Sequence, residues 1–269
     1  QEENKERVES IPITKIKDFN NHPYHVRTDE DMIHLVESIK ENGQLVPVLV
    51  RPTTDGFEMI SGHRRKYALE LIGQNEVHAI VRNLTDEQAT ILMVDSNIQR
   101  EHILPSERGF AYKMKLEAMK HQGKRTDLTC GQLGHKLNGK KTIQILAEDV
   151  GDSFKQIQRY IRLTELIEPL RVLVDGLSED GKKIALNPAV ELSFLNKEQQ
   201  QDVYKFIQEL DATPSYAQTM RMKELAKSNR LDENVIYTIM TEEKANQKDK
   251  LSFKMDQVDK YFPKSYTPR

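Results

Sequence analysis

The sequence contains no tryptophan and one cysteine, and only 6% of its 269 residues are aromatic. With 37% hydrophobic and 30% charged residues, the composition predicts a soluble, helix-rich protein with a large polar surface. No apolar run approaches the roughly 18 residues that a membrane span needs, and no signal peptide is visible. Because Cys130 cannot form an internal disulfide, nothing in the sequence indicates an oxidising compartment. We therefore expect a cytoplasmic protein with no membrane partner.

Familiar catalytic patterns are missing as well. The eight histidines show neither an HExxH motif nor another paired spacing typical of a metal site. A Ser/His/Asp arrangement cannot be recognised without a fold that brings the three residues together. The residues alone therefore assign no catalytic group.

Charge is distributed unevenly along the chain, although the net charge is only −2. Residues 113–162 contain 11 Lys or Arg against 5 Asp or Glu, whereas both flanking parts are net acidic. A basic middle segment is a candidate for binding a polyanion such as DNA, although a charge run is more often a solvated face.

The first third of the chain interleaves strand and helix patterns. Residues 1–10 are highly charged, and we expect a disordered arm there. Thr28 and Asp31 have the spacing of a capping box before a helix that ends at Gly43. Alternating or β-branched runs and helical periodicity predict a compact α+β domain over residues 11–95, with strands at 11–16, 46–51, 57–60 and 77–81 and helices at 28–43, 64–73 and 85–95.

A turn inside this domain has the chemistry of an anion site. The strand that ends at Ile60 leads into Ser61-Gly62-His63, and Arg64, Arg65 and Lys66 then open a helix. Free backbone N–H groups at a helix N-terminus, next to two arginines, can bind phosphate. A glycine followed by basic residues is, however, usually only a solvated helix start.

From residue 96 onward the pattern is almost purely helical. In residues 143–162, Ala147, Gly151 and Ile157 have the offsets of a helix-turn-helix, which needs a small residue at the helix contact, a glycine in the turn and a branched core residue. Gln and Arg can read base edges, and Lys suits phosphates. An ordinary helical hairpin would use the same residues. The candidate DNA-binding residues on the second helix, which Ser153 would cap, are Ser153, Lys155, Gln156, Gln158, Arg159 and Arg162.

The pattern of the last part of the chain predicts helices that serve in packing or self-association. Amphipathic helices are expected at 188–195, 197–210 and 216–227. The chain begins at Gln1 rather than Met and stops at Arg269, and we expect both ends to be cuts in a longer protein. The predicted divisions are an arm at 1–10, an α+β domain at 11–95, a helix-turn-helix domain at 96–170, a helical extension at 171–240, and a polar linker with a truncated C-terminal region at 241–269.

Four motifs in order resemble those of one family. They are HPYHVR at 22–27, SIKENGQLVPVLVRP at 38–52, SGHRRKYALELIG at 61–73 and SNIQREHILPSE at 96–107. With the following helix-turn-helix, they resemble the ParB/RepB/Spo0J partition proteins over residues 11–170. The later helices are similar to ParB-like proteins of mobile elements in Gram-positive bacteria. The implied fold is an α+β, sulfiredoxin-like ParB domain followed by an all-α helix-turn-helix domain and further helices.

The resemblance also implies a function. Such proteins bind a centromere-like site in double-stranded DNA as homodimers, many bind CTP with Mg²⁺ and close into sliding clamps, and a ParA-like ATPase is a further expected partner. The expected location is the nucleoid or a plasmid. Asn97 would also serve as a metal ligand. The nucleotide-binding residues implied are Arg27, Gly43, Gln44, Pro47, Gly62, His63, Arg64, Arg65, Asn97 and Arg100.

Two positions depart from the family pattern, which usually has Glu where this chain has His63 and Ser96. A neutral histidine cannot replace a carboxylate as a Mg²⁺ ligand, and a serine offers only a weak neutral oxygen. Asp95 is adjacent but should point about 100° away on a helix. We therefore expect nucleotide binding with slow or absent turnover, so that the protein is at most a weak CTPase.

Two other functions remain open. A helix-turn-helix regulator could keep the first domain only as a dimer interface, having lost the nucleotide. An enzyme related to sulfiredoxin or to ATP-dependent kinases is more remote, because sulfiredoxin needs a nucleophilic cysteine where this chain has His63.

Overall fold

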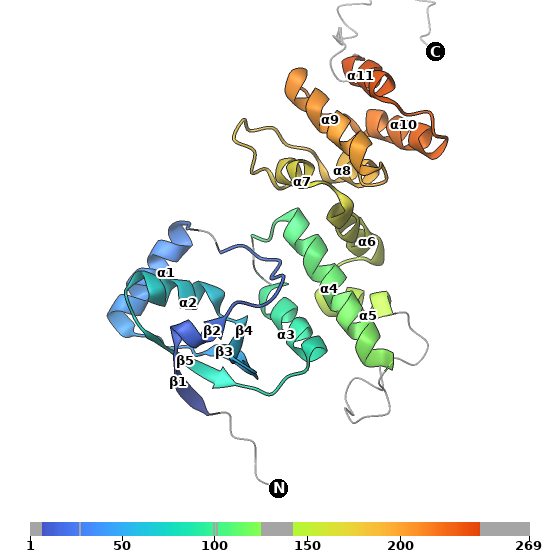
Figure 1. The fold of residues 1–269 in the computed structure, drawn as a ribbon. Coiled ribbons are helices and arrows are strands. Elements are labelled where there is room, and N and C mark those ends of the chain that lie inside the picture. The colour runs from blue at the N-terminus through green and yellow to red at the C-terminus, as the bar shows by residue number, and fades with distance from the viewer. Residues whose placement is uncertain (1–6, 27, 99, 101, 125–141, 243–269) are drawn as a thin grey trace, which may run out of the picture.

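The computed structural model describes residues 7–26, 28–98, 100, 102–124 and 142–242. Within these ranges the chain forms one mixed sheet, two short 3₁₀ turns and a series of helices (Figure 1). The strands are β1 (Val8–Pro12), β2 (Ile16–Lys17), β3 (Val48–Thr53), β4 (Gly56–Ser61) and β5 (Glu76–Val81). The helices are α1 (Glu30–Asn42), α2 (His63–Leu71), α3 (Asp86–Ile98), α4 (Pro105–Lys124), α5 (Thr142–Val150), α6 (Phe154–Arg162), α7 (Glu168–Asp175), α8 (Leu186–Leu192), α9 (Lys197–Glu209), α10 (Tyr216–Lys227) and α11 (Glu233–Thr241).

The sheet has the strand order β1-β5-β3-β4-β2. The pairs β1 with β5 and β3 with β4 are antiparallel, whereas β3 with β5 and β2 with β4 are parallel. Parallel neighbours need a crossover connection, and the one from β3 to β5 runs through β4 and helix α2. Helix α2 follows β4 directly, so its N-terminus lies at the carboxyl end of that strand.

Helices cover both faces of the sheet. Met59 packs in a core cluster with Met32 of α1 and Leu69 of α2. The next residue, Ile60, packs instead against Met93 of α3, because successive side chains of a strand point to opposite faces. Helix α3 therefore lies between the sheet and α4, as Figure 1 shows.

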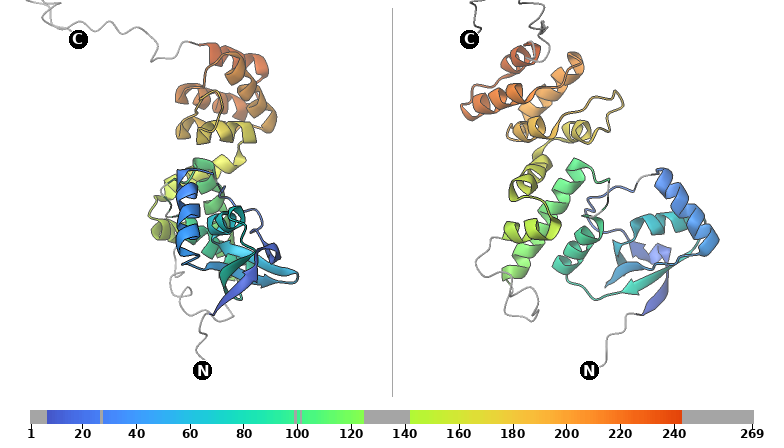
Figure 2. Two further views of the ribbon diagram at one scale, coloured as in Figure 1. Left: turned by 90° about the vertical axis from the view of Figure 1, so that its left-hand side faces the viewer. Right: turned by 180° about the vertical axis from the view of Figure 1, so that it is seen from behind.

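The helical remainder has two further cores. Tyr112 of α4, Leu146 of α5 and Ile157 of α6 form a small buried cluster. Helices α7 to α11 enclose a separate and larger one, beginning at Leu163. In Figure 2 the helices after α6 form a body at the opposite end of the molecule from the sheet. None of the described helices is long and apolar enough to cross a membrane.

Several predicted boundaries differ from the structure. The single strand expected at 11–16 is wrong: a 3₁₀ turn at Ile13–Lys15 divides β1 from β2. Residues Val8–Ser10 pair with β5, so the prediction of a disordered arm is wrong for them. Residues 1–6 of the expected arm lie outside the described residues. The cap of α1 is Asp29, whose side chain accepts a hydrogen bond from Met32 N, and not Thr28.

Other differences lie at helix ends. Helix α3 continues to Ile98, so the domain boundary expected between residues 95 and 96 falls inside a helix. The sequence interpretation did not predict α7 or α11, whose apolar positions have short helical repeats. Thr241 ends α11, and the remainder of the expected linker from residue 243 lies outside the described part.

Candidate functional site

The turn before α2 is built around Gly62. Its φ of 113° lies in the region that favours glycine. A Cβ atom here would come within 2.6 Å of Cγ1 of Val48, a fully buried residue of β3. The backbone therefore passes close to the sheet, and α2 starts at the next residue with its N-terminal amides directed beyond the strand end.

A cavity of about 410 Å³ opens at this turn. Three arginines line it: Arg64 and Arg65 from α2, and Arg100 from the segment after α3. Its remaining lining residues are Asp31, Leu35, Ser61, Gly62 and Ser96. Helix α1, the α2 turn and the end of α3 thus bring together side chains that are far apart in the sequence.

The arginines of the cavity are held in different ways. Arg65 donates to the carbonyl oxygens of Val46 and Pro47, at 2.7 and 2.6 Å. Arg64 donates to Oδ1 of Asp29 at 2.9 Å. The guanidinium of Arg100 lies 5.9 Å from the centre of the Tyr24 ring.

Like charge is concentrated at this cavity. Partial desolvation and then the positive charge of Arg64 lower the pKa of Arg100, and burial followed by the charge of Arg100 lowers the pKa of Arg65. Arg65 and Arg100 still remain protonated at neutral pH, because the ordinary pKa of an arginine lies far above neutrality. A polyphosphate placed among them would relieve this repulsion, so the arrangement suits a multiply charged anion.

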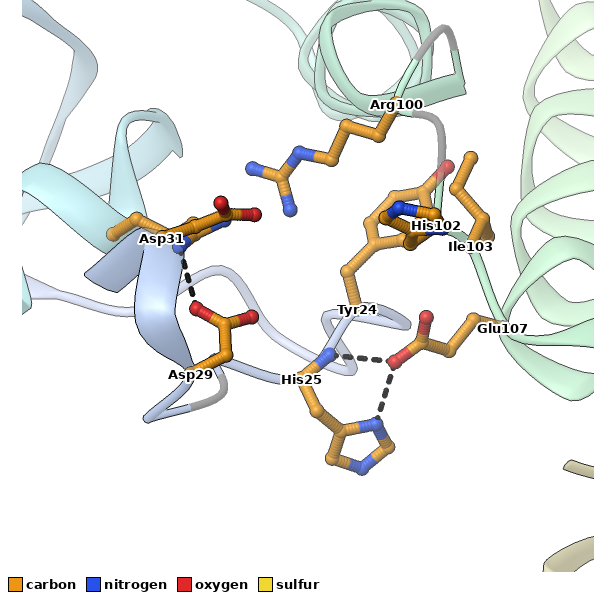
Figure 3. A pocket seen from close by; sticks show the side chains of 9 residues that line it. Tyr24, His25, Asp29, Asp31, Arg100, His102, Ile103 and Glu107 are labelled. Carbon is orange, nitrogen blue, oxygen red and sulfur yellow. Dashed lines mark hydrogen bonds and ion pairs between the residues drawn. The ribbon is translucent and has the colours of Figure 1, made fainter. Parts of the chain in front are cut away.

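A second cavity of about 290 Å³ adjoins the first and shares Asp31, Arg64 and Arg100 with it. Figure 3 shows its other wall, where the segment before α1 faces the start of α4. There the buried carboxylate of Glu107 accepts hydrogen bonds from the backbone N–H and from Nδ1 of His25, both at 3.0 Å. Glu107 also accepts from Leu104 N at 3.1 Å, so it fixes the N-terminus of α4 against the first domain.

The residues expected between α1 and β3 to bind the nucleotide, Gly43, Gln44 and Pro47, do not line either cavity. Gly43 ends α1 with a φ of 71°. The Gln44 amide accepts from His78 N at 2.7 Å and donates to His78 O at 2.8 Å, so its side chain is bound to β5. Pro47 contributes its carbonyl oxygen to Arg65. Arg27 lies outside the described residues.

His63 and Asn97 do not face the cavity. The His63 ring is buried and stacks on His22, with ring centres 3.9 Å apart. Burial, and then the neighbouring His22, lower the pKa of His63 to about 3. Asn97 is only 2% exposed and donates its amide to Met93 O and to Ser96 Oγ. In this conformation its side chain does not fit the role of a Mg²⁺ ligand.

Metal ligands are scarce elsewhere too. Ser96 lines the cavity, but its hydroxyl donates to Met93 O at 2.9 Å. Asp95 points away, as its helical position predicts, and accepts from the buried amine of Lys115 at 2.6 Å. Within the described ranges, no three His, Cys, Asp or Glu side chains gather as a metal-binding group.

The predicted helix pair is present as α5 and α6. Gly151 in the turn has a φ of 75°, Ser153 Oγ accepts from Gln156 N at 3.2 Å, and Ile157 is fully buried. Asp152 in the same turn accepts from the Tyr112 hydroxyl of α4 at 2.5 Å, which fixes the turn to the small core.

The candidate DNA-binding side chains of α6 have different surroundings. Lys155, Gln158 and Arg159 are exposed on one side of the helix, and Gln156 is half-buried. Arg162 is bound within the protein: its guanidinium donates to Oγ and to the backbone oxygen of Ser193 and lies 4.1 Å from the centre of the Phe194 ring. Arg162 therefore connects α6 to α8.

The sequence interpretation missed several residues that join the parts of the molecule. At the start of α4, Ser106 donates its N–H and its hydroxyl to Asp175 of α7, at 2.9 and 2.5 Å. Lys115 of α4 lies within 3.6 Å of Asp149 of α5 in addition to Asp95. Ser106 and Glu107 belong to the motif at 96–107, where the sequence pattern indicates Ser106 as the cap of the next helix; α4 instead begins at Pro105, so Ser106 lies in its first turn.

Comparison with known proteins identifies the first domain. Residues 1–98 match the family model of the ParB N-terminal domain. The matched part of the chain, which carries most of the arginine-lined cavity, is thus similar to a ParB N-terminal domain.

Similar proteins extend the comparison beyond this domain. The chain is 38% identical over 110 residues to the chromosome-partitioning protein Spo0J of Thermus thermophilus, covering 41% of each chain. It is 31% identical over 171 residues to the probable chromosome 1-partitioning protein ParB of Deinococcus radiodurans, covering 63% of this chain and 52% of the relative. The chain thus matches about half or less of the length of these relatives.

Among solved structures, a C-terminally truncated ParB from Caulobacter crescentus, complexed to the centromeric parS site, aligns with a TM-score of 0.44 and 22% identity. The alignment covers 82% of this chain and 99% of that one.

Proposed function

We propose that this chain is a DNA-binding partition protein of the ParB type, whose first domain binds a nucleoside triphosphate. The observation that carries the proposal is the cavity lined by Arg64, Arg65 and Arg100 at the Gly62 turn, inside a ParB N-terminal domain. Cationic forks together with amides at a helix N-terminus are what a triphosphate needs. The choice of CTP, and the switch to a clamp on DNA, rest on the resemblance.

Calorimetric titration of the four ribonucleoside triphosphates tests whether the chain binds a nucleotide and which one it prefers. We expect CTP to bind the wild-type chain, and we expect this binding to be lost in Arg64→Ala. Arg7→Ala is the matched control, because it removes an equal charge from an exposed position outside the cavity. No binding of any nucleotide to a folded wild-type chain contradicts the proposal.

Turnover is expected to be slow or absent. His63 is buried away from the cavity, and Ser96 provides only a hydroxyl that already donates to a carbonyl. Mg²⁺ would accompany the nucleotide by resemblance, but Asn97 as it lies here does not reach the cavity. Steady phosphate release from CTP with cognate DNA, abolished by Arg64→Ala, would overturn this expectation.

The DNA part of the proposal is assigned to α6. Lys155, Gln158 and Arg159 are exposed together, and Gln156 lies beside them. After selection of a preferred duplex from random sequences, Arg159→Ala and Gln158→Ala should reduce discrimination, each good base contact being worth roughly 1–3 kcal/mol. Lys40→Ala, an exposed change on α1 outside the basic segment, is the control. An equal loss of affinity for preferred and random DNA would show that these residues contact the phosphates and not the bases.

The burial of His63 and Asn97 favours a second candidate, a helix-turn-helix regulator that does not bind nucleotide. Sequence-selective DNA binding without any nucleotide binding would establish it. The homodimer, a ParA-like partner, nucleoid association and a mobile-element role belong to the proposal by resemblance. The two partition proteins compared above carry chromosomal names.

A further inference from the structure

Asp29 occupies an unusual position between two helices. Its Oδ1 atom accepts from Met32 N at 2.9 Å and from Nη2 of Arg64 at 2.9 Å. One carboxylate thus caps α1 and neutralises the first arginine of α2, from 35 residues away in the sequence. Figure 3 shows Asp29 on the wall of the second cavity, below Asp31.

Asp31 provides the natural comparison. It is exposed and lines both cavities, whereas Asp29 lines only the smaller one. Among the described residues, Asp31 makes no hydrogen bond or ion pair that would tie it to an arginine. The two carboxylates therefore place similar negative charge near the same arginines, but only Asp29 is bonded to one.

A phosphate entering the cavity needs the same donor that Asp29 holds. The pair is accessible to such a competitor, because the side chains of Arg64 and Asp29 are 28% and 42% exposed. Asp29 keeps its bond to Met32 N if Arg64 turns toward a ligand, so the cap of α1 survives the exchange.

We propose that Asp29 is a displaceable counter-ion that holds Arg64 when the site is empty and competes with the anion for it. This inference rests on the proposed function in that it concerns the same cavity. Asp29 thereby sets the affinity for polyphosphate, and occupancy of the cavity releases the contact between the N-terminus of α1 and α2.

The experiment uses inorganic tripolyphosphate, titrated by calorimetry into the wild-type chain and into Asp29→Asn, Asp31→Asn and Arg64→Ala. Asparagine caps a helix as well as aspartate does, so Asp29→Asn removes the charge and keeps α1. Competition predicts binding about two- to fivefold tighter in Asp29→Asn, as expected for a partly exposed ion pair. The gain in Asp31→Asn should be smaller.

The double variant Asp29→Asn/Arg64→Ala sharpens the test. If Asp29 acts by competing for Arg64, its replacement has no effect once Arg64 is gone. Three results overturn the proposal: unchanged or weaker binding in Asp29→Asn, an equal or larger gain in Asp31→Asn, or a gain that persists in the double variant.

A failure of the nucleotide proposal gives a different set of binding results for tripolyphosphate and CTP. If tripolyphosphate binds the variants with the expected order of affinities but CTP does not bind, the counter-ion role of Asp29 is supported and the nucleotide assignment is overturned. If neither ligand binds any folded variant, both are overturned.

Discussion

At the scale of single residues, the anion turn depends on one glycine. Gly62 has a positive φ, and an added Cβ would meet the buried Val48 side chain at 2.6 Å. Its close approach to β3 is what directs the α2 amides and Arg64 toward the cavity.

We predict that Gly62→Ala lowers the free energy of unfolding by about 2–4 kcal/mol, the sum of backbone strain and overpacking. Urea unfolding measures it. Gly73→Ala is the matched control, because Gly73 has a φ of 76° but no atom within 4 Å of the added Cβ, and it should cost only about 1 kcal/mol. Equal costs for the two variants would show that the contact with Val48 does not constrain the turn.

The buried His63 makes stability depend on pH. Burial lowers the pKa of His63 to about 3, so between about pH 6.5 and 3 the unfolded chain binds a proton that the folded chain does not. Stability from this residue is therefore present above pH 6.5 and is lost as the pH falls toward 3. The slope is at most about 1.4 kcal/mol per pH unit.

We predict that His63→Gln flattens this dependence. Urea unfolding of both proteins between pH 4 and 7 measures it, with the wild-type chain losing stability more steeply on acidification. His78→Gln, at an exposed strand position, should keep the wild-type slope. Parallel profiles for wild type and His63→Gln would mean that His63 is protonated in the folded protein.

At the scale of elements, α4 is the helix on which the middle of the molecule depends. It contacts α3 through the Lys115–Asp95 pair, and it carries Tyr112 in the core with α5 and α6. Helix α6 crosses it at Gly109, where a Cβ would lie 2.3 Å from the backbone oxygen of Tyr160.

Replacing Gly109 with alanine tests how closely the two helices approach, because the variant is stabilised if the added Cβ has room and destabilised if it does not. Inside a helix, Gly→Ala usually stabilises by roughly 0.5–1 kcal/mol. Here we predict a loss of about 1–3 kcal/mol, because α6 must move away from α4. Thermal unfolding measures the change, and weaker DNA binding should accompany it if α6 reads DNA. A stabilised variant would show that the two helices are not in close contact at this point.

At the scale of the whole molecule, polar side chains in the described part of the chain join its bodies. Glu107 binds the segment before α1, Ser106 binds α7, and Arg162 joins α6 to α8. Burial raises the pKa of Asp175, the partner of Ser106, against the lowering effect of those hydrogen bonds. The position of α6 relative to the C-terminal helices thus depends on these polar contacts together with Tyr160, which packs against both helical cores.

The Arg162 bridge distinguishes a structural role from DNA contact. Arg162→Lys loses the forked donation to Ser193, and we predict a loss of about 1–2 kcal/mol in the free energy of unfolding. Arg159→Lys, at an exposed position on the same helix, should leave stability unchanged and weaken DNA binding. Urea unfolding and DNA titration of both variants measure this. Unchanged stability in Arg162→Lys would return Arg162 to the DNA-binding set.

The sequence by itself determined the local features. The glycine at 62, the Ser153 cap, the Gly151 turn and most helix ranges follow from preferences that act within a few residues. It could not fix the short strands near residue 13, because pairing with β5 and β4 decides where they end.

Only the tertiary structure decided which of the candidate residues meet. It brings Arg64, Arg65 and Arg100 together, but it buries His63 against His22 and binds Arg162 to Ser193, 31 residues later. It also pairs Arg64 with Asp29, which no local pattern indicated. Such contacts join residues that are distant in sequence, and they depend on how the helices pack across the sheet and across α4, which local propensity and periodicity do not encode.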